Sequence, residues 1–213
     1  MSIERLLEGY RRFRKTRFAA TQEVYRKLGK QGQSPEILFI ACCDSRVDPA
    51  TIFDTGPGEL FVVRNVANLV PPWAPDGSHH GTSAAIEFAV RHLKVRDIVV
   101  MGHAQCGGVA ALLNGFHEQP GASDFIGSWI SLAESAKQRM LARPDSHGDQ
   151  QRELEYEIVR HSLGNLMGFS WVREKVEAGE LRLHGWHFGI THGKLAILDR
   201  DRDEFRVLDT ETA

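Results

Sequence analysis

Two short segments of the sequence concentrate side chains that bind metals or react as nucleophiles: Cys42-Cys-Asp-Ser-Arg46 and Gly102-His-Ala-Gln-Cys-Gly-Gly108. Cysteine sulfur, histidine nitrogen and aspartate oxygen are donors that zinc takes in four-coordinate sites, whereas soft thiolates disfavour magnesium and calcium. The spacings C-x-D and H-x-x-C together therefore indicate a zinc site. A Cys106 nucleophile with His103 as its base is the alternative chemistry, but it leaves the pairing of Cys42 with Asp44 unexplained.

Both segments follow apolar runs of strand length. Glu36–Cys42 leads into the first segment and Asp97–Gly102 into the second, and a third run, Glu59–Asn65, lies between them. A helical pattern over residues 84–93 separates the last two runs. Strands that alternate with helices predict a parallel sheet with helices on both faces. Ligands of such sheets bind beyond the carboxyl ends of the strands, so we expect the two reactive segments to meet there.

The remaining periodicity predicts an α/β fold with a mostly parallel sheet of about four strands, an antiparallel edge and flanking helices. A helical segment from about residue 150 to 177 precedes the fourth run, Leu181–Ile190. The short runs Lys194–Leu198 and Glu204–Leu208 are typical of a closing pair of strands. At about 150 residues per domain, we expect residues 1–213 to form one domain, with residues 1–30 as an N-terminal helical arm.

The composition excludes several classes of protein. Apolar residues make up 42% of the chain, which is enough for a core and excludes general disorder. The 26 Lys and Arg nearly cancel the 28 Asp and Glu, so we expect no nucleic-acid partner held by bulk charge. The longest apolar run falls far short of the roughly 18 residues of a membrane helix, and no secretory leader is recognisable. We therefore predict a cytoplasmic protein that does not bind membranes.

Cysteine usage and missing motifs narrow the chemistry further. Three cysteines are too few, and odd in number, for a disulfide framework. The sequence has no phosphate loop and no G-x-G-x-x-G dinucleotide fingerprint. It also lacks the C-x-x-C of redox proteins and the paired motifs of zinc deaminases. A metal centre is the chemistry that remains.

Three strings, in order, carry a resemblance to a known family: Ala41-Cys-Cys-Asp-Ser-Arg-Val47, Pro57-Gly-Glu-Leu-Phe-Val-Val-Arg-Asn-Val-Ala-Asn68 and Gly102-His-Ala-Gln-Cys-Gly-Gly108. Together they resemble the β-class carbonic anhydrases. The neighbouring Gly32-Gln-Ser-Pro35 and the later His184-Gly-Trp186 are similar to the plant-like branch. The resemblance runs from about residue 30 to 190, which is most of the chain.

The resemblance implies a zinc enzyme that reversibly hydrates carbon dioxide to bicarbonate and a proton through a zinc-bound hydroxide. Cys42, His103 and Cys106 match the family's zinc ligands, with one Zn²⁺ per chain. Asp44 and Arg46 match its catalytic carboxylate and guanidinium. A bidentate Arg46 suits Asp44 to accept a hydrogen bond from the reacting water. A hydrolase of carbonyl sulfide or carbon disulfide on the same scaffold, and a non-catalytic zinc or bicarbonate-binding protein, are the alternatives.

The resemblance also implies a substrate pocket that is largely contributed by a partner subunit, and hence a homodimer or an assembly of dimers. The matching positions are Gln33, Phe61, Val66 and Phe88, and Gly107 offers a backbone that a small substrate can approach. Phe88 departs from the family, which commonly has tyrosine there. Cys43 stands where the family usually has serine, and strand alternation predicts that it points away from the metal.

One branch of the family closes its site when bicarbonate occupies a second pocket built from Trp, Arg and Tyr side chains. Here Arg64 is retained, but Phe39 replaces the Trp and Phe188 replaces the Tyr. Both replacements remove a hydrogen-bond donor. We therefore expect an open site that bicarbonate does not close.

Overall fold

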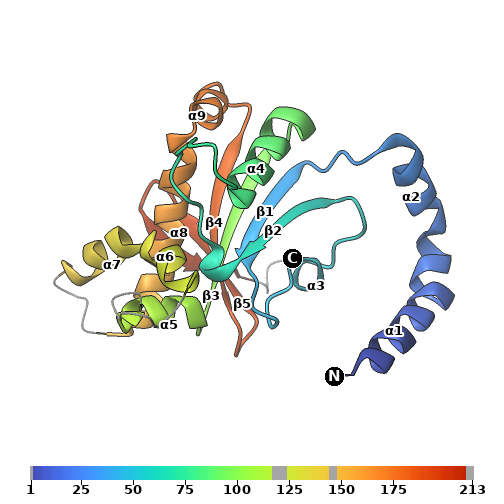
Figure 1. Ribbon diagram of the computed structural model, residues 1–213, viewed down its shortest axis with the longest axis horizontal. Helices are drawn as coiled ribbons and strands as arrows, with labels where there is room; N and C mark the ends of the chain where they lie inside the picture. The colour runs from blue at the N-terminus through green and yellow to red at the C-terminus, as the bar shows by residue number, and fades with distance from the viewer. Residues whose placement is uncertain (1, 117–123, 144–147, 210–213) are drawn as a thin grey trace.

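A six-stranded sheet in the order β2-β1-β3-β4-β5-β6 forms the centre of the computed structural model, which describes residues 2–116, 124–143 and 148–209 (Figure 1). The strands β2, β1, β3 and β4 are parallel, and β5 and β6 continue the sheet in antiparallel fashion. The predicted fold class is confirmed. The strand bounds are β1 Ile37–Cys42, β2 Leu60–Asn65, β3 Asp97–His103, β4 Arg182–Gly189, β5 Lys194–Asp199 and β6 Glu204–Val207.

The helices connect the parallel strands and follow the predicted alternation. Their bounds are α1 Ile3–Lys15, α2 Arg17–Gln31, α3 Pro49–Ile52, α4 Gly81–Glu87, α5 Gly107–Leu113, α6 Ile126–Ser131, α7 Glu134–Leu141, α8 Gln150–Gly168 and α9 Ser170–Glu177. A 3-10 turn, η1 (Val66–Asn68), follows β2, and a π-helical segment, η2 (Phe88–Leu93), continues α4. None of the helices in the described ranges is long and apolar enough to cross a membrane.

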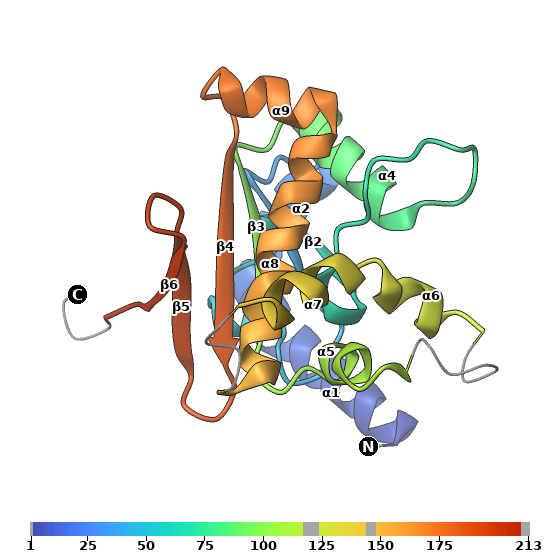
Figure 2. The same ribbon diagram turned by 90° about the vertical axis from the view of Figure 1, so that its left-hand side faces the viewer.

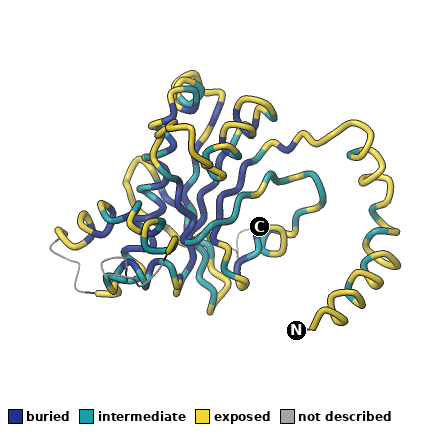
Figure 3. Tube along the Cα trace, viewed as in Figure 1, coloured by how far each residue is buried: buried dark blue, intermediate teal, exposed yellow. Residues whose placement is uncertain are grey.

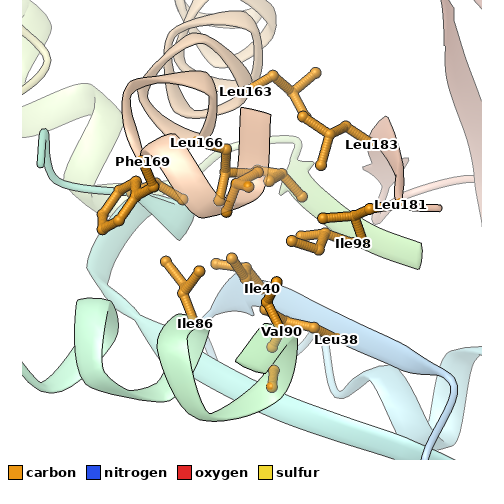
Figure 4. Close-up of a cluster of buried hydrophobic side chains, with 14 of the residues drawn as sticks. Leu38, Ile40, Ile86, Val90, Ile98, Leu163, Leu166, Phe169, Leu181 and Leu183 are labelled. Atoms are coloured by element: carbon orange, nitrogen blue, oxygen red, sulfur yellow. The ribbon is translucent and has the colours of Figure 1, made fainter. Parts of the chain in front are cut away.

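The main core lies between one face of the sheet and the helices α4, η2 and α8 (Figures 2 and 4). Leu38 and Ile40 of β1 and Ile98 of β3 are fully buried against Val90 of η2 and Leu166 of α8. Each such side chain contributes about 1.5–3 kcal/mol on burial. This layer fixes α8 across β3 and β4, which matters for the metal centre because α8 also contacts α5.

The opposite face of the sheet carries a smaller, largely aromatic cluster. Phe39 of β1 is buried, with ring centroids 5.2 Å from Phe53 and 5.8 Å from Trp186 of β4. The short helix α3 covers part of this face through Ile52. The described part of the chain therefore covers the two faces unequally.

The N-terminal arm leaves the sheet and buries none of its own side chains (Figures 1 and 3). The periodicity predicts one helix over residues 2–30, and the structure shows two, α1 and α2, broken at Thr16. The longer predicted helix of residues 150–177 is likewise divided, at Phe169, into α8 and α9. At both breaks one residue leaves the helical region of φ and ψ: Thr16 has φ −116° and ψ −83°, and Phe169 has φ −78° and ψ 114°.

Candidate metal centre

The carboxyl ends of β1 and β3 bring Cys42 and His103 together, because the two strands are adjacent and parallel. Cys42 is the last residue of β1 and His103 the last of β3, while Cys106 is the N-cap of α5. One ligand atom from each of the three residues lies within 4.8 Å of the others, and all three are buried. The two sulfur atoms are 3.9 Å apart. The predicted convergence of the two reactive segments is thus observed.

His103 presents one nitrogen to this cluster without a hydrogen-bond partner. Its Nδ1 lies 2.9 Å from the carbonyl oxygen of Ala104, which fixes the proton on Nδ1 and leaves Nε2 as an acceptor. Nε2 is buried and has no partner among the described residues. An unsatisfied buried polar atom costs about 1–3 kcal/mol, so this nitrogen fits a metal ligand.

The two thiols also fit a cation. A hydrogen bond from Cys106 lowers the pKa of Cys42 to about 4, and that same contact raises the pKa of Cys106. Two thiolates this close repel each other, so both ionise together only when a positive charge lies between them. Two sulfurs and one imidazole nitrogen form a donor set that zinc prefers, with a fourth position left for water.

A clamped carboxylate lies beside the cluster. Arg46 donates from Nε to Asp44 Oδ1 at 2.9 Å and from Nη2 to Oδ2 at 2.8 Å, and its backbone N–H donates to Oδ1 at 2.9 Å. The hydrogen bonds from Arg46 hold the pKa of Asp44 well below its usual range. Asp44 Oδ2 lies 3.9 Å from His103 Nε2, so the carboxylate faces the metal cluster without belonging to it.

Hydrogen bonds from Arg64 of β2 hold the loop between Cys42 and Asp48. Its guanidinium donates to the carbonyl oxygens of Cys42 at 2.9 Å and Asp44 at 2.7 Å, and to Asp48 Oδ2 at 3.2 Å. Cys43 is exposed and lies outside the ligand cluster, as strand alternation predicts. Arg64 therefore positions the segment that carries a ligand and the carboxylate.

The start of α5 packs tightly against η1. A Cβ on Gly108 would lie 2.6 Å from Val66 Cγ1 and 3.2 Å from the Cβ of Ala67, so only glycine fits there. Ala67 itself has a positive φ of 62°. A Cβ on Gly107, by contrast, would meet nothing within 4 Å, so its backbone is approachable. Val66 and Gly107 thus lie at the end of the sheet that carries the metal cluster.

The other predicted pocket residues lie at the opposite end of the strands. Phe61 pairs with Leu38, whereas Asn65 pairs with Cys42. Phe61 and Asn65 are four residue steps apart along the strand, which is about 13 Å. Phe88 packs on Phe61 with ring centroids 5.8 Å apart. Gln33 is exposed in the connection before β1. One chain therefore does not bring these three residues to its own metal cluster.

Glu155 of α8 and His187 of β4, which the sequence does not point to, support the centre. The backbone N–H of Cys106 donates to Glu155 Oε1 at 3.1 Å, and His187 Nε2 lies 2.9 Å from Glu155 Oε2. Arg46 Nη2 also donates to the carbonyl oxygen of Gln105 at 3.1 Å. The only sequence signal is a carboxylate at position 155, four residues before Val159 on the buried face of α8.

Comparisons with known proteins agree with this geometry. The family model for carbonic anhydrase matches residues 37–195. The chain is 39% identical over 178 residues to beta carbonic anhydrase 5, chloroplastic, of Arabidopsis thaliana, and 36% identical over 191 residues to beta carbonic anhydrase 6, mitochondrial, of the same plant. These alignments cover 83% and 89% of this chain but only 58% and 65% of the two relatives.

Solved structures give the same result over nearly the whole chain. The β-carbonic anhydrase CcaA superposes with a TM-score of 0.87 and 32% identity, covering 98% of this chain and 92% of that one. A tetrameric β-carbonic anhydrase from Sordaria macrospora superposes with a TM-score of 0.77 and 30% identity, covering 92% and 96%. A third relative from Arabidopsis thaliana, beta carbonic anhydrase 3, is 35% identical, and the alignment covers 94% of this chain and 78% of the relative. By sequence, fold and ligand cluster, the chain belongs to the β-carbonic anhydrase family.

Proposed function

We propose that the protein reversibly hydrates carbon dioxide to bicarbonate and a proton with one zinc ion per chain. The observation that carries this proposal is a carboxylate clamped by Arg46, with its Oδ2 3.9 Å from the unpartnered Nε2 of His103. Cys42, His103 and Cys106 hold the metal. Zinc, when bound, lowers the pKa of a coordinated water towards about 7 and so supplies a nucleophile at neutral pH.

Asp44 and Arg46 orient the reacting water in this proposal. The low pKa of Asp44 keeps its carboxylate ionised, so that Oδ2 accepts a hydrogen bond from the water that attacks carbon dioxide. Arg46 has both carboxylate oxygens engaged and therefore keeps Asp44 from turning onto the metal. The proton lost by the water passes to the solvent, and the product leaves as a bicarbonate ion. The open space at Gly107 lets a small substrate approach the backbone there.

A second copy of the chain completes the substrate pocket. Phe61, Phe88 and Gln33 lie away from the metal cluster of their own chain, and 44% of Phe88 is exposed. Removal of such aromatic surface from water favours association. We therefore assign these side chains to the site of a partner subunit in a homodimer or an assembly of dimers, with carbon dioxide and bicarbonate as ligands.

We also propose a cytoplasmic location. Zinc needs Cys42 and Cys106 as thiolates, and a reducing compartment such as the cytoplasm keeps these two residues from forming a disulfide. We propose no nucleic-acid or membrane partner.

A stopped-flow assay of the zinc-loaded protein tests the function. We expect fast hydration of carbon dioxide and much slower hydrolysis of carbonyl sulfide, and loss of hydration when a chelator removes the zinc. A zinc-containing protein that hydrolyses carbonyl sulfide faster than it hydrates carbon dioxide, or that acts on neither substrate, would contradict the proposal.

A further inference from the structure

Glu155 is a carboxylate on the buried face of α8 that the proposed reaction does not use. It is 2% exposed, and α8 lies against β3 and β4 and contacts α5 (Figure 2). Within the described ranges no lysine or arginine forms an ion pair with it, and its one titratable partner is His187 of β4. A buried carboxylate is costly unless hydrogen bonds compensate for the lost water. The donors that Glu155 binds therefore show what it does.

The two carboxylate oxygens of Glu155 join β4 to the turn that carries the metal ligands. Oε1 accepts the backbone N–H of Cys106 at 3.1 Å. Oε2 lies 2.9 Å from Nε2 of His187, and because an ionised carboxylate only accepts, the imidazole donates from Nε2. His187 pairs in register with Gly102 of β3, the residue before His103. The carboxylate therefore fixes Cys106 relative to the strands that present His103.

The imidazole of His187 is itself held in place by packing. It is 4% exposed, and the ring of Tyr156 stands edge-on to it with centroids 4.8 Å apart. A Cβ on Gly102 would lie 3.6 Å from His187 Cδ2 and 3.0 Å from Val159 Cγ2, so β3 and α8 approach closely beside the ring. A donor that cannot turn orients the carboxylate that accepts from it.

The turn that carries Cys106 has little local restraint of its own. Gln105 has a positive φ of 57°, which residues other than glycine rarely adopt. Gly107 and Gly108 follow directly, and glycine backbones are permissive. On one side the turn is held by Arg46, whose Nη2 donates to the carbonyl oxygen of Gln105 at 3.1 Å. A second restraint is needed to fix the sulfur.

The start of α5 lacks the usual local cap. Cys106 is its N-cap, but the side chain makes no capping hydrogen bond, which leaves the sulfur for a metal. In a capping box, a glutamate three residues after the N-cap accepts the N–H of the N-cap residue, but Val109 stands at that position here. Glu155 takes this role from α8, and Gln151 Nε2 donates to the carbonyl oxygen of Cys106 at 3.4 Å.

We propose that Glu155 is a positioning residue for the metal centre and that His187 acts through it. The carboxylate holds the backbone of Cys106 from α8, so the sulfur is already placed for zinc and the protein retains the metal more tightly. Replacement of such partners of metal ligands typically costs about 10–100-fold in metal affinity. This inference rests on the zinc site of the proposed function but not on the reaction.

Transfer of zinc from the full-length, zinc-loaded protein to an excess of chelator tests this role. Glu155→Gln keeps the size of the side chain but replaces the carboxylate with a weaker, neutral acceptor, so zinc should be released about 10-fold faster. Glu157→Gln is the matched control. Glu157 also lies on α8 and is 2% exposed, but it pairs with Arg143 at 2.7 Å and Arg160 at 2.9 Å. This variant should unfold at a lower temperature yet release zinc as the wild type does.

The two variants separate positioning of Cys106 from a general loosening of α8. Faster release from Glu155→Gln alone supports the proposal. Equal acceleration in both variants would show that any loosening of α8 frees the metal, and wild-type release from Glu155→Gln would show that the carboxylate has no such role. Either result would overturn the proposal.

The cobalt(II)-substituted protein gives a second readout, the absorption band for charge transfer from sulfur to cobalt. Because the band depends on how the thiolates are oriented at the metal, it should shift in Glu155→Gln and stay in place in Glu157→Gln. A band that keeps its wild-type position in Glu155→Gln would overturn the positioning role, whatever the rate of zinc release.

His187→Gln tests whether the imidazole acts through Glu155. The single variant should release zinc faster than the wild type, and its addition to Glu155→Gln should change the rate no further. Wild-type release from His187→Gln, or further acceleration in the double variant, would overturn the link between the two residues. If Glu155→Gln does not fold, the single variant His187→Gln decides the proposal in the same way.

These readouts follow the metal rather than the hydration of carbon dioxide. A protein that holds zinc as described here but does not hydrate carbon dioxide would contradict the proposed function alone. Failure of this inference is therefore distinguishable from failure of the proposed function.

Discussion

The two halves of the candidate active site differ in how the chain builds them. The metal half is assembled within one chain, where adjacent strand ends and the start of α5 bring three buried ligands within 4.8 Å of one another. The aromatic half, Phe61 and Phe88, lies at the other end of β2 and is partly exposed. The metal cluster therefore follows from intrachain topology, whereas the substrate wall that we propose depends on a second copy of the chain.

The largest loss of activity is expected when one of the candidate metal ligands is replaced. Cys106→Ser replaces a thiolate with a hydroxyl that zinc holds weakly, so the purified variant should retain little zinc. Its kcat/KM for carbon dioxide should fall by at least about 1000-fold, because the metal supplies the nucleophile. Elemental analysis and stopped-flow measurements check both outcomes.

Cys43→Ser is the matched control for that variant. The same change of sulfur to oxygen, one residue from a ligand but at an exposed position, should leave zinc content and turnover nearly intact. Zinc retained in Cys106→Ser and lost in Cys43→Ser would reverse the assignment of the ligands.

A smaller loss of activity is expected when the carboxylate beside the metal cluster is replaced. Asp44→Asn keeps the shape of the side chain but removes its charge, so zinc content should be unchanged and kcat should fall by about 100-fold. If the variant instead loses its zinc, Asp44 is a ligand. Arg46→Ala should also lower kcat, because it releases the carboxylate that Arg46 now holds through two oxygens.

The metal half was predictable from the sequence because motifs mark its residues and the carboxyl ends of parallel strands lie along one edge of a sheet. Cys42 and His103 end apolar runs that are recognisable as neighbouring parallel strands, and Cys106 begins the helix that follows. Glu155 was not predictable, because no motif marks it and its contact with the backbone of Cys106 depends on the angle at which α8 crosses the sheet. The break of the arm at Thr16 was not predicted, because no glycine or proline marks it and apolar residues stand on both sides of it.

An intersubunit complementation experiment tests the aromatic half. Chains with Asp44→Asn are damaged in the metal half, and chains with Phe61→Asp in the aromatic half. When the two are unfolded, mixed in equal amounts and refolded together with zinc, half of the dimers contain one of each. Each mixed dimer then has one site built entirely from intact residues, so about a quarter of the wild-type activity should return.

The parental variants, each refolded alone, are the controls and should show no more than the roughly 100-fold reduced activity expected for Asp44→Asn. Recovery close to zero in the mixture, with dimers present by light scattering, would show that Phe61 serves its own chain. The comparison between the two halves would then fail, because both would belong to one subunit.

The smallest effect concerns bicarbonate. A second, regulatory pocket needs free donors, but Phe39 is buried with its ring centroid 5.8 Å from that of Trp186 and offers none. Arg64 has three of its five N–H donors engaged, by Cys42, Asp44 and Asp48. An anion in this region would lose charge-assisted hydrogen bonds of about 1.5–3 kcal/mol each. Added bicarbonate should therefore compete only at the metal, without cooperativity.

The dependence of rate on pH sharpens this prediction. Because Arg46 lowers the pKa of Asp44, the carboxylate stays ionised throughout the neutral range, and its contribution is lost only as the pH falls below its ordinary value of about 4. The acid limb of kcat/KM between pH 6 and 9 should consequently follow one proton with a midpoint near 7, the value expected for water on zinc. A steep loss involving several protons below about pH 8, deepened cooperatively by bicarbonate, would mean that Asp44 leaves Arg46 and that the two halves of the site move together.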